Sequence, residues 1–197
     1  MSKILSSKNL TFIAMMAALG NVLSALSIQL SPIIPSIPVG PLNFSLALDL
    51  SHITTFIAAL FGGPLVGGVT GLIGGAVAAF EFGFSKGNLV TGFGLPIGKA
   101  LTGLAAGLLM SRLNPNKNRL MMVVSTVASY IPEGLFTILI FVIVYPIFFP
   151  LTPLSFILPF TAQIIVKAFA EMVIMGILIS VMTDNQGFKD SMKSYFM

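Results

Sequence analysis

The chain has 197 residues, of which 56% are hydrophobic and only 8% are charged, and its mean hydropathy is +1.02. Soluble domains carry about 25% charged residues, so this composition excludes a soluble domain and predicts a chain that lies in lipid. The absence of cysteine excludes disulfides and thiolate metal sites. The net charge of +4 is spread over short segments without a basic, aromatic-rich patch, which argues against nucleic-acid binding.

Six apolar runs, separated by proline, glycine and charge, predict an all-α membrane protein with six transmembrane helices in one integral domain, residues 1–197. Each run approaches the ~20 residues needed to cross ~30 Å of hydrocarbon. Because no A-x-A site follows the basic start of the chain, we expect the first run to be a retained helix rather than a cleaved signal peptide. The predicted spans are 10–28, 44–61, 64–81, 89–111, 120–146 and 158–182.

Basic residues predict the orientation of these spans. With the N-terminus inside, seven lysines and arginines lie on cytoplasmic segments, and only Lys86 lies in an outer loop. An even number of spans then places both termini in the cytoplasm. The seven residues are Lys3, Lys8, Arg112, Lys117, Arg119, Lys189 and Lys193.

Proline and glycine mark two further features. The outer connections before the second and sixth spans are long, apolar and proline-rich, which fits a lid over a cavity as well as a plain connector in the membrane interface. Seven glycines between positions 62 and 75 predict close helix packing, since a phosphate loop would need a G-K-[ST] ending. The prolines are Pro32, Pro35, Pro38 and Pro41, then Pro146, Pro150, Pro153 and Pro159.

Ionisable residues inside the predicted spans favour a hydrated pocket, because an unpaired charge at mid-membrane costs about 3 kcal/mol or more. Internal pairing is the alternative: Lys167 with Glu171 at i, i+4, Lys99 with Glu133, and Asp49 with His52. We expect Asp49 and His52 a turn or two below the outer surface and Lys99 about three turns into its span. The full set is Asp49, His52, Glu81, Lys99, Glu133, Lys167 and Glu171.

Catalytic patterns are weak. His52 is the only histidine, which excludes H-E-x-x-H and multi-histidine metal sites, and G-x-S-x-G is absent. We therefore predict no enzyme activity, no metal site and no cofactor. Aromatic rings near the outer ends of the third and fourth spans suit a flat ligand, although packing or lipid contact is the better interpretation of any single ring. These are Phe80, Phe82, Phe84 and Phe93.

Four short motifs and the predicted topology together resemble the substrate-binding (S) component of energy-coupling factor (ECF) vitamin transporters. The first span carries Ala14-Met15-Met16-Ala17-Ala18, similar to the small-residue pattern by which S components dock on the transmembrane coupling subunit. Residues 48–53 (LDLSHI) and 61–68 (FGGPLVGG) resemble the family's acidic-hydroxyl stretch and its G-P-x-x-G turn. Residues 159–167 (PFTAQIIVK) resemble the proline, amide and lysine before its last helix.

The resemblance covers essentially the whole chain, and it implies high-affinity capture of a vitamin or related nutrient at the outer face of a prokaryotic plasma membrane. The first outer loop would act as the lid. A coupling subunit and two ATPases would supply the energy, since this sequence has no ATP-binding motif. The binding residues it favours are Asp49, His52, Glu81, Asn88, Lys99, Glu133, Gln163 and Lys167, with Ala14 and Ala18 at the docking surface.

Two departures affect the substrate. His52 and Thr54-Thr55 stand where riboflavin-type members carry a second acid and a proline, and the tryptophans of thiamin-type sites are absent. The histidine-containing N-terminal motif of the nickel and cobalt type is also missing. Riboflavin or another flat, partly polar vitamin is slightly favoured.

Two other function classes remain open on the sequence. A stand-alone ion-coupled transporter or channel would use the lysine and glutamate set as a proton relay and would work without an ATPase. A membrane scaffold would bind no small molecule, and neutralising Glu133 would then change only its stability.

Overall fold

Helices make up most of the computed structural model, which describes residues 6–39, 42–45, 48–113 and 118–196, with side chains except at 37–39, 42–45, 193 and 196. The helices are α1 (Ser7–Leu30), α2 (His52–Gly62), α3 (Pro64–Gly74), α4 (Ala76–Phe82), α5 (Leu89–Leu113), α6 (Arg119–Ser129), α7 (Ile131–Ile138), α8 (Tyr145–Phe148), α9 (Leu154–Asp184) and α10 (Gln186–Phe196). A short 3₁₀ helix, η1 (Phe84–Lys86), precedes α5, and a π-helix, η3 (Leu139–Val144), joins α7 to α8. The strands β1 (Ser36–Val39) and β2 (Leu42–Ser45) form an antiparallel hairpin.

Five helical segments of the described chain are long and apolar enough to cross a membrane. They correspond to the predicted first, third, fourth, fifth and sixth spans. Membrane-spanning segments must satisfy their backbone polar groups internally, which explains why these long apolar runs are helical. The five are Ser7–Leu30, Pro64–Lys86, Leu89–Leu113, Arg119–Phe148 and Leu154–Asp184.

The predicted second span, 44–61, differs from the structure. Only α2 is helical there, and its 11 residues cover about 16 Å at 1.5 Å per residue, roughly half of the hydrocarbon thickness. Residues 44 and 45 belong to β2 instead. The Asp49 carboxylate accepts the backbone N–H of Ser51 at 3.0 Å, a local contact that competes with helix and delays its start. A count of six complete spans therefore stays a prediction.

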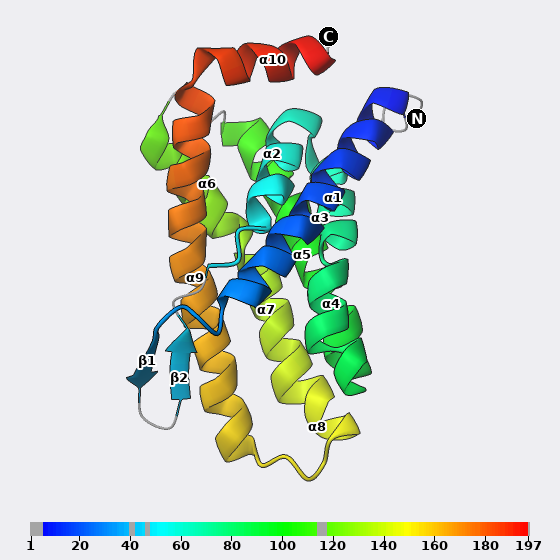
Figure 1. Cartoon of the computed structure of the whole chain (residues 1–197), viewed down its shortest axis with the longest axis vertical. Helices are drawn as coiled ribbons and strands as arrows, with labels where there is room; N and C mark the ends of the chain where they lie inside the picture. Colours follow the sequence, from blue (N-terminus) through cyan, green and yellow to red (C-terminus); the bar gives the residue numbers. More distant parts are fainter. Residues whose placement is uncertain (1–5, 40–41, 46–47, 114–117, 197) are drawn as a thin grey trace.

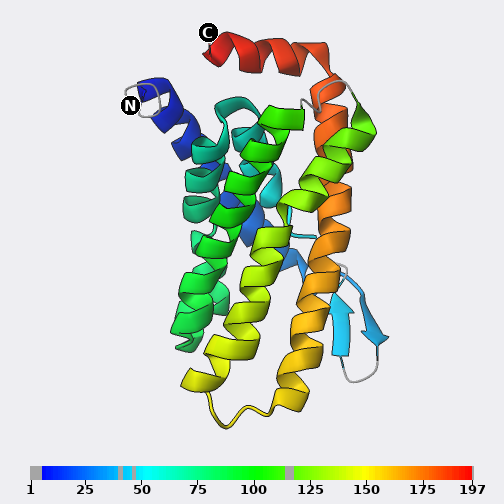
Figure 2. The same cartoon turned by 180° about the vertical axis from the view of Figure 1, so that it is seen from behind.

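Different chain ends, turns and connections lie at the two ends of the bundle (Figures 1 and 2). Both described chain ends, the α2–α3 turn, the end of α5 and the start of α6 lie at one end, which we call the termini end. The α8–α9 connection and the start of α5 lie at the opposite end, which we call the far end. Both Lys3 and Lys117 fall outside the described residues. The arrangement agrees with a common side for the other basic segments, and the orientation in the membrane stays a prediction.

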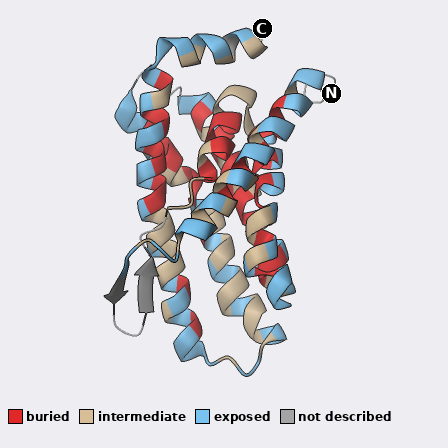
Figure 3. Ribbon diagram, viewed as in Figure 1, coloured by how far each residue is buried: buried red, intermediate tan, exposed pale blue. Residues whose placement is uncertain are grey.

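The apolar core fills the half of the bundle nearer the termini end (Figure 3). Phe12 of α1, Phe56 of α2 and Met122 of α6 meet Met172 and Met175 of α9 there, all at most 2% exposed. The apolar side of α10 closes this core from above, where Phe188, Met192 and Tyr195 pack on it. Fewer residues are buried toward the far end, which leaves room for a cavity.

Close packing of α3 on α5 depends on glycine, as the sequence predicts. A Cβ atom on Gly67 would lie 2.7 Å from the carbonyl oxygen of Gly103, and one on Gly71 would collide with the backbone of Lys99. Small residues of this kind let helices approach closely in lipid. The α2–α3 turn has a different requirement, because Gly63 adopts a φ of 83°, a value that favours glycine.

Replacing Gly67 with valine should lower the thermal stability of the protein. The added side chain meets backbone that cannot move aside, and overpacking of this kind costs about 1–3 kcal/mol. At about 2–4 °C per kcal/mol for a chain of this size, the midpoint of unfolding in detergent should fall by several degrees. The matched control is Gly94→Ala on α5, where a Cβ meets only Ile140 at 3.7 Å. An unchanged midpoint for Gly67→Val would contradict this account of the packing.

The hairpin occupies the first proline-rich connection. Ser36 pairs with Ser45 and Val39 with Leu42, and β2 contacts α9. Figures 1 and 2 show the hairpin beside α9 rather than across the far end of the bundle. A lid role for this connection stays a prediction, and Pro41 lies outside the described residues.

Candidate functional site

A cavity of about 530 Å³ lies toward the far end of the bundle, between α5, the α7–α8 segment and α9. Such a volume is typical of small-molecule sites. On the α5 side, Gly94 and Gly98 line the cavity without side chains, which leaves space beside the helix. Asn88 and Thr91 add polar groups nearer the start of α5. Asn88 also fixes the start of α5, since its Oδ1 accepts the backbone N–H of Thr91 at 3.0 Å.

Aromatic rings form most of the opposite walls. Phe141 of η3 meets Phe160 of α9 edge-on, with ring centroids 5.6 Å apart, and Phe160 stacks on Phe156 at 5.9 Å. Tyr145 contributes a further ring from α8. Rings that hold one another in this way present flat apolar surface with little freedom to move. The cavity therefore suits a flat or elongated, largely apolar ligand.

Glu133 brings the one carboxylate among the described lining residues of this cavity. Pro132 lies at the start of α7, where its missing N–H is tolerated, so the helix restarts after Tyr130 and Glu133 falls in its first turn. The Thr102 hydroxyl donates to Glu133 Oε2 at 2.5 Å. Gly98 makes room for the carboxylate, because a Cβ there would lie 3.2 Å from Glu133 Oε1.

A second, polar cavity of about 150 Å³ lies between α1, the segment before α2, and α9. Ser24, Ser27 and Ser31 line it from α1, and Asp49, Lys167 and Glu171 line it from the other sides. It adjoins a set of charged and polar groups that we call the charged network: Lys99, Ser51, Asp49, Glu171 and Lys167.

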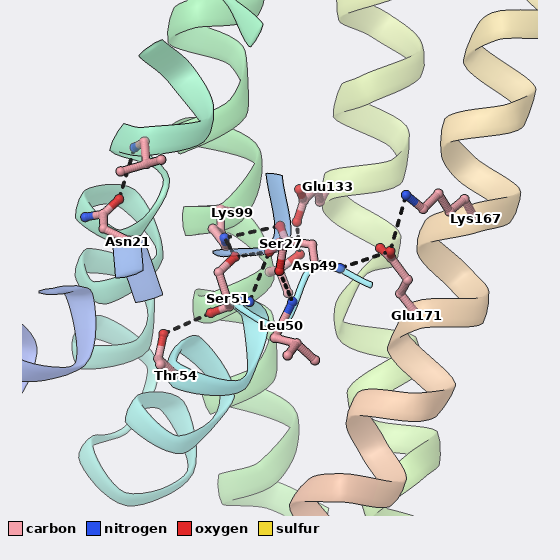
Figure 4. Close-up of polar contacts among 12 residues, drawn as sticks. Asn21, Ser27, Asp49, Leu50, Ser51, Thr54, Lys99, Glu133, Lys167 and Glu171 are labelled. Atoms are coloured by element: carbon pink, nitrogen blue, oxygen red, sulfur yellow. Dashed lines mark hydrogen bonds and ion pairs between the residues drawn. The ribbon is translucent and has the colours of Figure 1, made fainter. Parts of the chain in front are cut away.

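The charged network connects three elements through Asp49, which lies between α5 and α9 (Figure 4). Lys99 Nζ lies 3.7 Å from Asp49 Oδ2 and donates to Ser51 Oγ. Ser51 Oγ donates in turn to Asp49 Oδ1 at 2.5 Å. The backbone N–H of Asp49 donates to Glu171 Oε1 at 3.2 Å, and Lys167 Nζ lies 3.7 Å from the same oxygen.

Two cations and two carboxylates balance within this network. The predicted pairing of Lys167 with Glu171 is confirmed. The alternative pairing of Lys99 with Glu133 is wrong: among the ion pairs of the described residues, Lys99 pairs with Asp49, which the segment before α2 brings close to it. Charges that compensate one another in lipid need no charged ligand.

His52 is buried beside this network, and its expected part in substrate binding stays a prediction. Its ring lies 6.2 Å from that of Phe56, and its Nδ1 has no hydrogen-bond partner in the described structure. The alternative of a local hydrogen bond between His52 and Asp49 is not found among those of the described residues, where the Asp49 carboxylate accepts from Ser51. His52 begins α2, which starts near the middle of the bundle (Figure 1), and its expected depth of a turn or two below the outer surface stays a prediction.

The predicted binding residues thus divide between separate places. Asn88 and Glu133 line the large cavity, and Asp49 and Lys167 line the small one. His52, Glu81, Lys99 and Gln163 line neither of these two cavities. Glu81 lies at the far end, where its backbone oxygen accepts the Ser85 hydroxyl at 2.9 Å.

Sequence reasoning missed most of the large cavity's wall. Tyr130, Thr137, Phe141 and Tyr145 share the cavity side of one helical segment with Glu133, at spacings of three, four and eight residues or more from it. This periodicity is present in the sequence, and it groups the ring-bearing residues with the carboxylate. Within the described chain, no group of three or more histidine, aspartate or glutamate side chains gathers as a metal site.

The outer side of α1 carries the predicted docking residues. Ala14 and Ala18 are exposed, whereas Phe12, Ile13 and Ala17 of the same helix are buried in the bundle. Asn21 ties α1 to its neighbours, donating to the carbonyl of Ile73 and accepting from the N–H of Val77, both at 3.0 Å. The helix therefore presents a small-residue surface from a fixed position.

Comparison with protein-family models gives a match to the family described as ECF transporter, substrate-specific component, over residues 8–185. The chain belongs to this family. The expected resemblance is thereby confirmed over most of the sequence. Neither the search of curated proteins nor that of solved structures returned a match.

Membership of the ECF substrate-specific components fixes the general role. The protein is a multi-pass membrane protein and a substrate-binding subunit of an ECF transporter, a class that is not an enzyme class. The family also implies a small-molecule substrate and association with ECF ATPase and transmembrane components. The large cavity has a volume typical of sites for molecules of this size.

Proposed function

We propose that this protein captures a vitamin or related small nutrient in the 530 Å³ cavity and delivers it across a prokaryotic plasma membrane. The observation that carries the proposal is an aromatic-walled cavity with a single carboxylate among its described lining residues, in a chain of the ECF substrate-specific family. Asn88 and Glu133 are the predicted residues that we assign to substrate contact. Asp49 and Lys167 border the smaller cavity and would act on the substrate through the segment before α2.

The remaining parts of the proposal concern partners and topology. A coupling subunit would dock on the exposed side of α1 at Ala14 and Ala18, and two ATPases would supply the energy. The protein would form a single integral domain, with α2 and the segment before it completing a sixth passage of the membrane. Both termini would lie in the cytoplasm, on the side of most basic residues. The far end, and with it the cavity, would then face outward.

Flat rings suit the aromatic walls, and riboflavin is the first candidate on the sequence pattern. The test is native mass spectrometry of the gently purified protein together with an absorbance spectrum of the same sample. A bound small molecule, yellow in the case of a flavin, is the expected result. Uptake of that molecule by cells should require the coupling subunit and ATPases, and should stop when ATP is depleted. Uptake without those subunits would instead favour a stand-alone ion-coupled transporter or channel.

Filling the cavity should abolish capture without unfolding the protein. At Gly94 a Cβ meets only Ile140 at 3.7 Å, so the side chain of a Gly94→Leu variant has space to extend into the cavity. We expect the bound fraction in native mass spectra to fall by about tenfold or more, since a blocked pocket loses more than the ~1.4 kcal/mol that a tenfold change represents. Gly94→Ala is the control and should bind as the unmodified protein does. Full binding by Gly94→Leu would place the substrate elsewhere.

A further inference from the structure

The large cavity has charge of opposite sign at its two ends. Lys86 lines it at the far end, where Nζ also lies 5.3 Å from the centre of the Phe82 ring. Glu133 lines it deeper in the bundle, opposite Gly98 of α5. Asn88 and Gly98 are ten residues apart in the chain, which corresponds to about 15 Å along a helix. The cavity is therefore long, with a cation at the outer end and a carboxylate at the inner end.

Glu133 differs from the other intramembrane carboxylates in its partners. Asp49 and Glu171 each have a lysine within 3.7 Å. Glu133 forms no ion pair in the described structure, and its Oε2 accepts from the neutral hydroxyl of Thr102. Its Oε1 lies beside Gly98, which has no side chain of its own to cover it. Lys99 acts on Glu133 electrostatically but not at ion-pair distance, and a carboxylate in lipid with so few direct partners is costly unless something else supplies donors.

The side chains around Glu133 limit the shape of a ligand that could supply those donors. Tyr130 and Thr137 lie one turn before and after it, and both face the cavity. The ring of Tyr130 is fixed by an edge-on contact with Phe169, with centroids 5.3 Å apart. A planar head could therefore lie along these side chains with its edge on the carboxylate. Two neighbouring N–H groups match a carboxylate best, because each donates to it in a charge-assisted bond.

We propose that the substrate binds head-first, with an amino-substituted nitrogen heterocycle donating N–H groups to Glu133, an aromatic or apolar body between the rings, and an anionic tail beside Lys86. This inference rests on the proposed capture function and narrows its substrate class. An imide edge, as in a flavin, has one N–H between two carbonyl oxygens, and those oxygens repel a carboxylate. The class therefore excludes riboflavin, which the sequence pattern slightly favours.

The test measures affinities of the full-length purified protein for four probes by calorimetry and thermal shift. Pteroate has an amino-heterocycle head, a benzene body and a carboxylate tail; pterin has the head alone. Riboflavin has an imide head, and pantothenate has a carboxylate without a heterocycle. We expect pteroate to bind most tightly, pterin to bind more weakly, and both to exceed riboflavin and pantothenate.

Two variants then separate the ends of the cavity. Glu133→Gln keeps an oxygen for the Thr102 hydroxyl and should weaken pteroate and pterin alike by about tenfold or more, the loss expected when a charge-assisted hydrogen bond becomes neutral. Lys86→Gln should weaken pteroate by about two- to fivefold, as for an exposed ion pair, and leave pterin unchanged. Glu81→Gln, a far-end acid outside both cavities, is the control and should change neither.

Several outcomes would overturn the inference. Tighter binding of riboflavin or pantothenate, or equal pteroate affinity in Glu133→Gln, would refute the head-first arrangement while leaving nutrient capture intact. Absence of binding by all four probes would also refute this substrate class. A different result would refute the capture function itself. The native protein would carry no small molecule, and cells with the coupling subunit and ATPases would show no uptake that depends on this protein.

Discussion

Replacing Ala14 and Ala18 together with tryptophan should stop uptake while leaving substrate binding unchanged. Both residues are exposed on α1, whereas Phe12 and Ala17 of the same helix are buried. A docking surface of small residues depends on close approach of two helices, and each bulky side chain adds an overpacking cost of about 1–3 kcal/mol. Because about 1.4 kcal/mol corresponds to tenfold in affinity, we expect assembly with the coupling subunit to weaken by about tenfold or more.

The measurement pairs two readouts on the same variant. Co-purification with the coupling subunit, and uptake in cells, report docking, whereas native mass spectrometry of the isolated protein reports capture. The matched control is Leu120→Trp with Val124→Trp, an exposed i, i+4 pair on α6, at 69% and 48% exposure. The control should assemble normally. Normal assembly of the α1 variant, or an equal defect in the α6 control, would remove α1 as the docking surface.

The long helices were predictable because lipid leaves the chain few alternatives. A run of about 20 apolar residues has no water for its backbone groups, so it becomes a helix whatever its neighbours are. The segment before α2 is different. It is as apolar as a span, and contacts with distant residues decide its structure. Leu50 N–H donates to Ser27 Oγ at 3.4 Å, and Asp49 N–H donates to Glu171, 122 positions away. A sequence pattern does not contain such contacts.

The same distinction explains the site. The type of residue could be predicted, since an ionisable group in lipid is costly and needs a reason. The i, i+4 pair of Lys167 and Glu171 was also predictable, because one helix fixes it. The partner of Lys99 was not, since Asp49 and Glu133 come from different elements and only the packing of α2 against α5 selects Asp49. Because Lys99 pairs with Asp49, the predicted residue Glu133 lines the large cavity without an ion-pair partner among the described residues, and Asp49 lies beside the small cavity.

Replacing Lys99 with methionine should destabilise the protein more than any other substitution considered above. Its side chain is 5% exposed, and it contacts both the Asp49 carboxylate and the Ser51 hydroxyl. Removing one partner of a buried ion pair leaves the other charge uncompensated, which costs about 3–5 kcal/mol. At 2–4 °C per kcal/mol we expect the unfolding midpoint in detergent to fall by about 6–20 °C, with a lower yield of folded protein.

Neutralising both partners separates this structural role from substrate binding. In a Lys99→Met, Asp49→Asn double variant the charged network keeps only the paired charges of Lys167 and Glu171. The asparagine side-chain oxygen can still accept from Ser51, and the backbone N–H of the same residue still reaches Glu171. Replacing both partners of a buried pair is often close to neutral, so we expect most of the lost stability to return. Lys99 lines neither of the two cavities and Asp49 lines only the smaller one, so the double variant should keep a small molecule bound in the large cavity in native mass spectra. A folded double variant that is empty would instead support the sequence prediction that Lys99 or Asp49 contacts the substrate, and would extend the site from the aromatic cavity into the charged network.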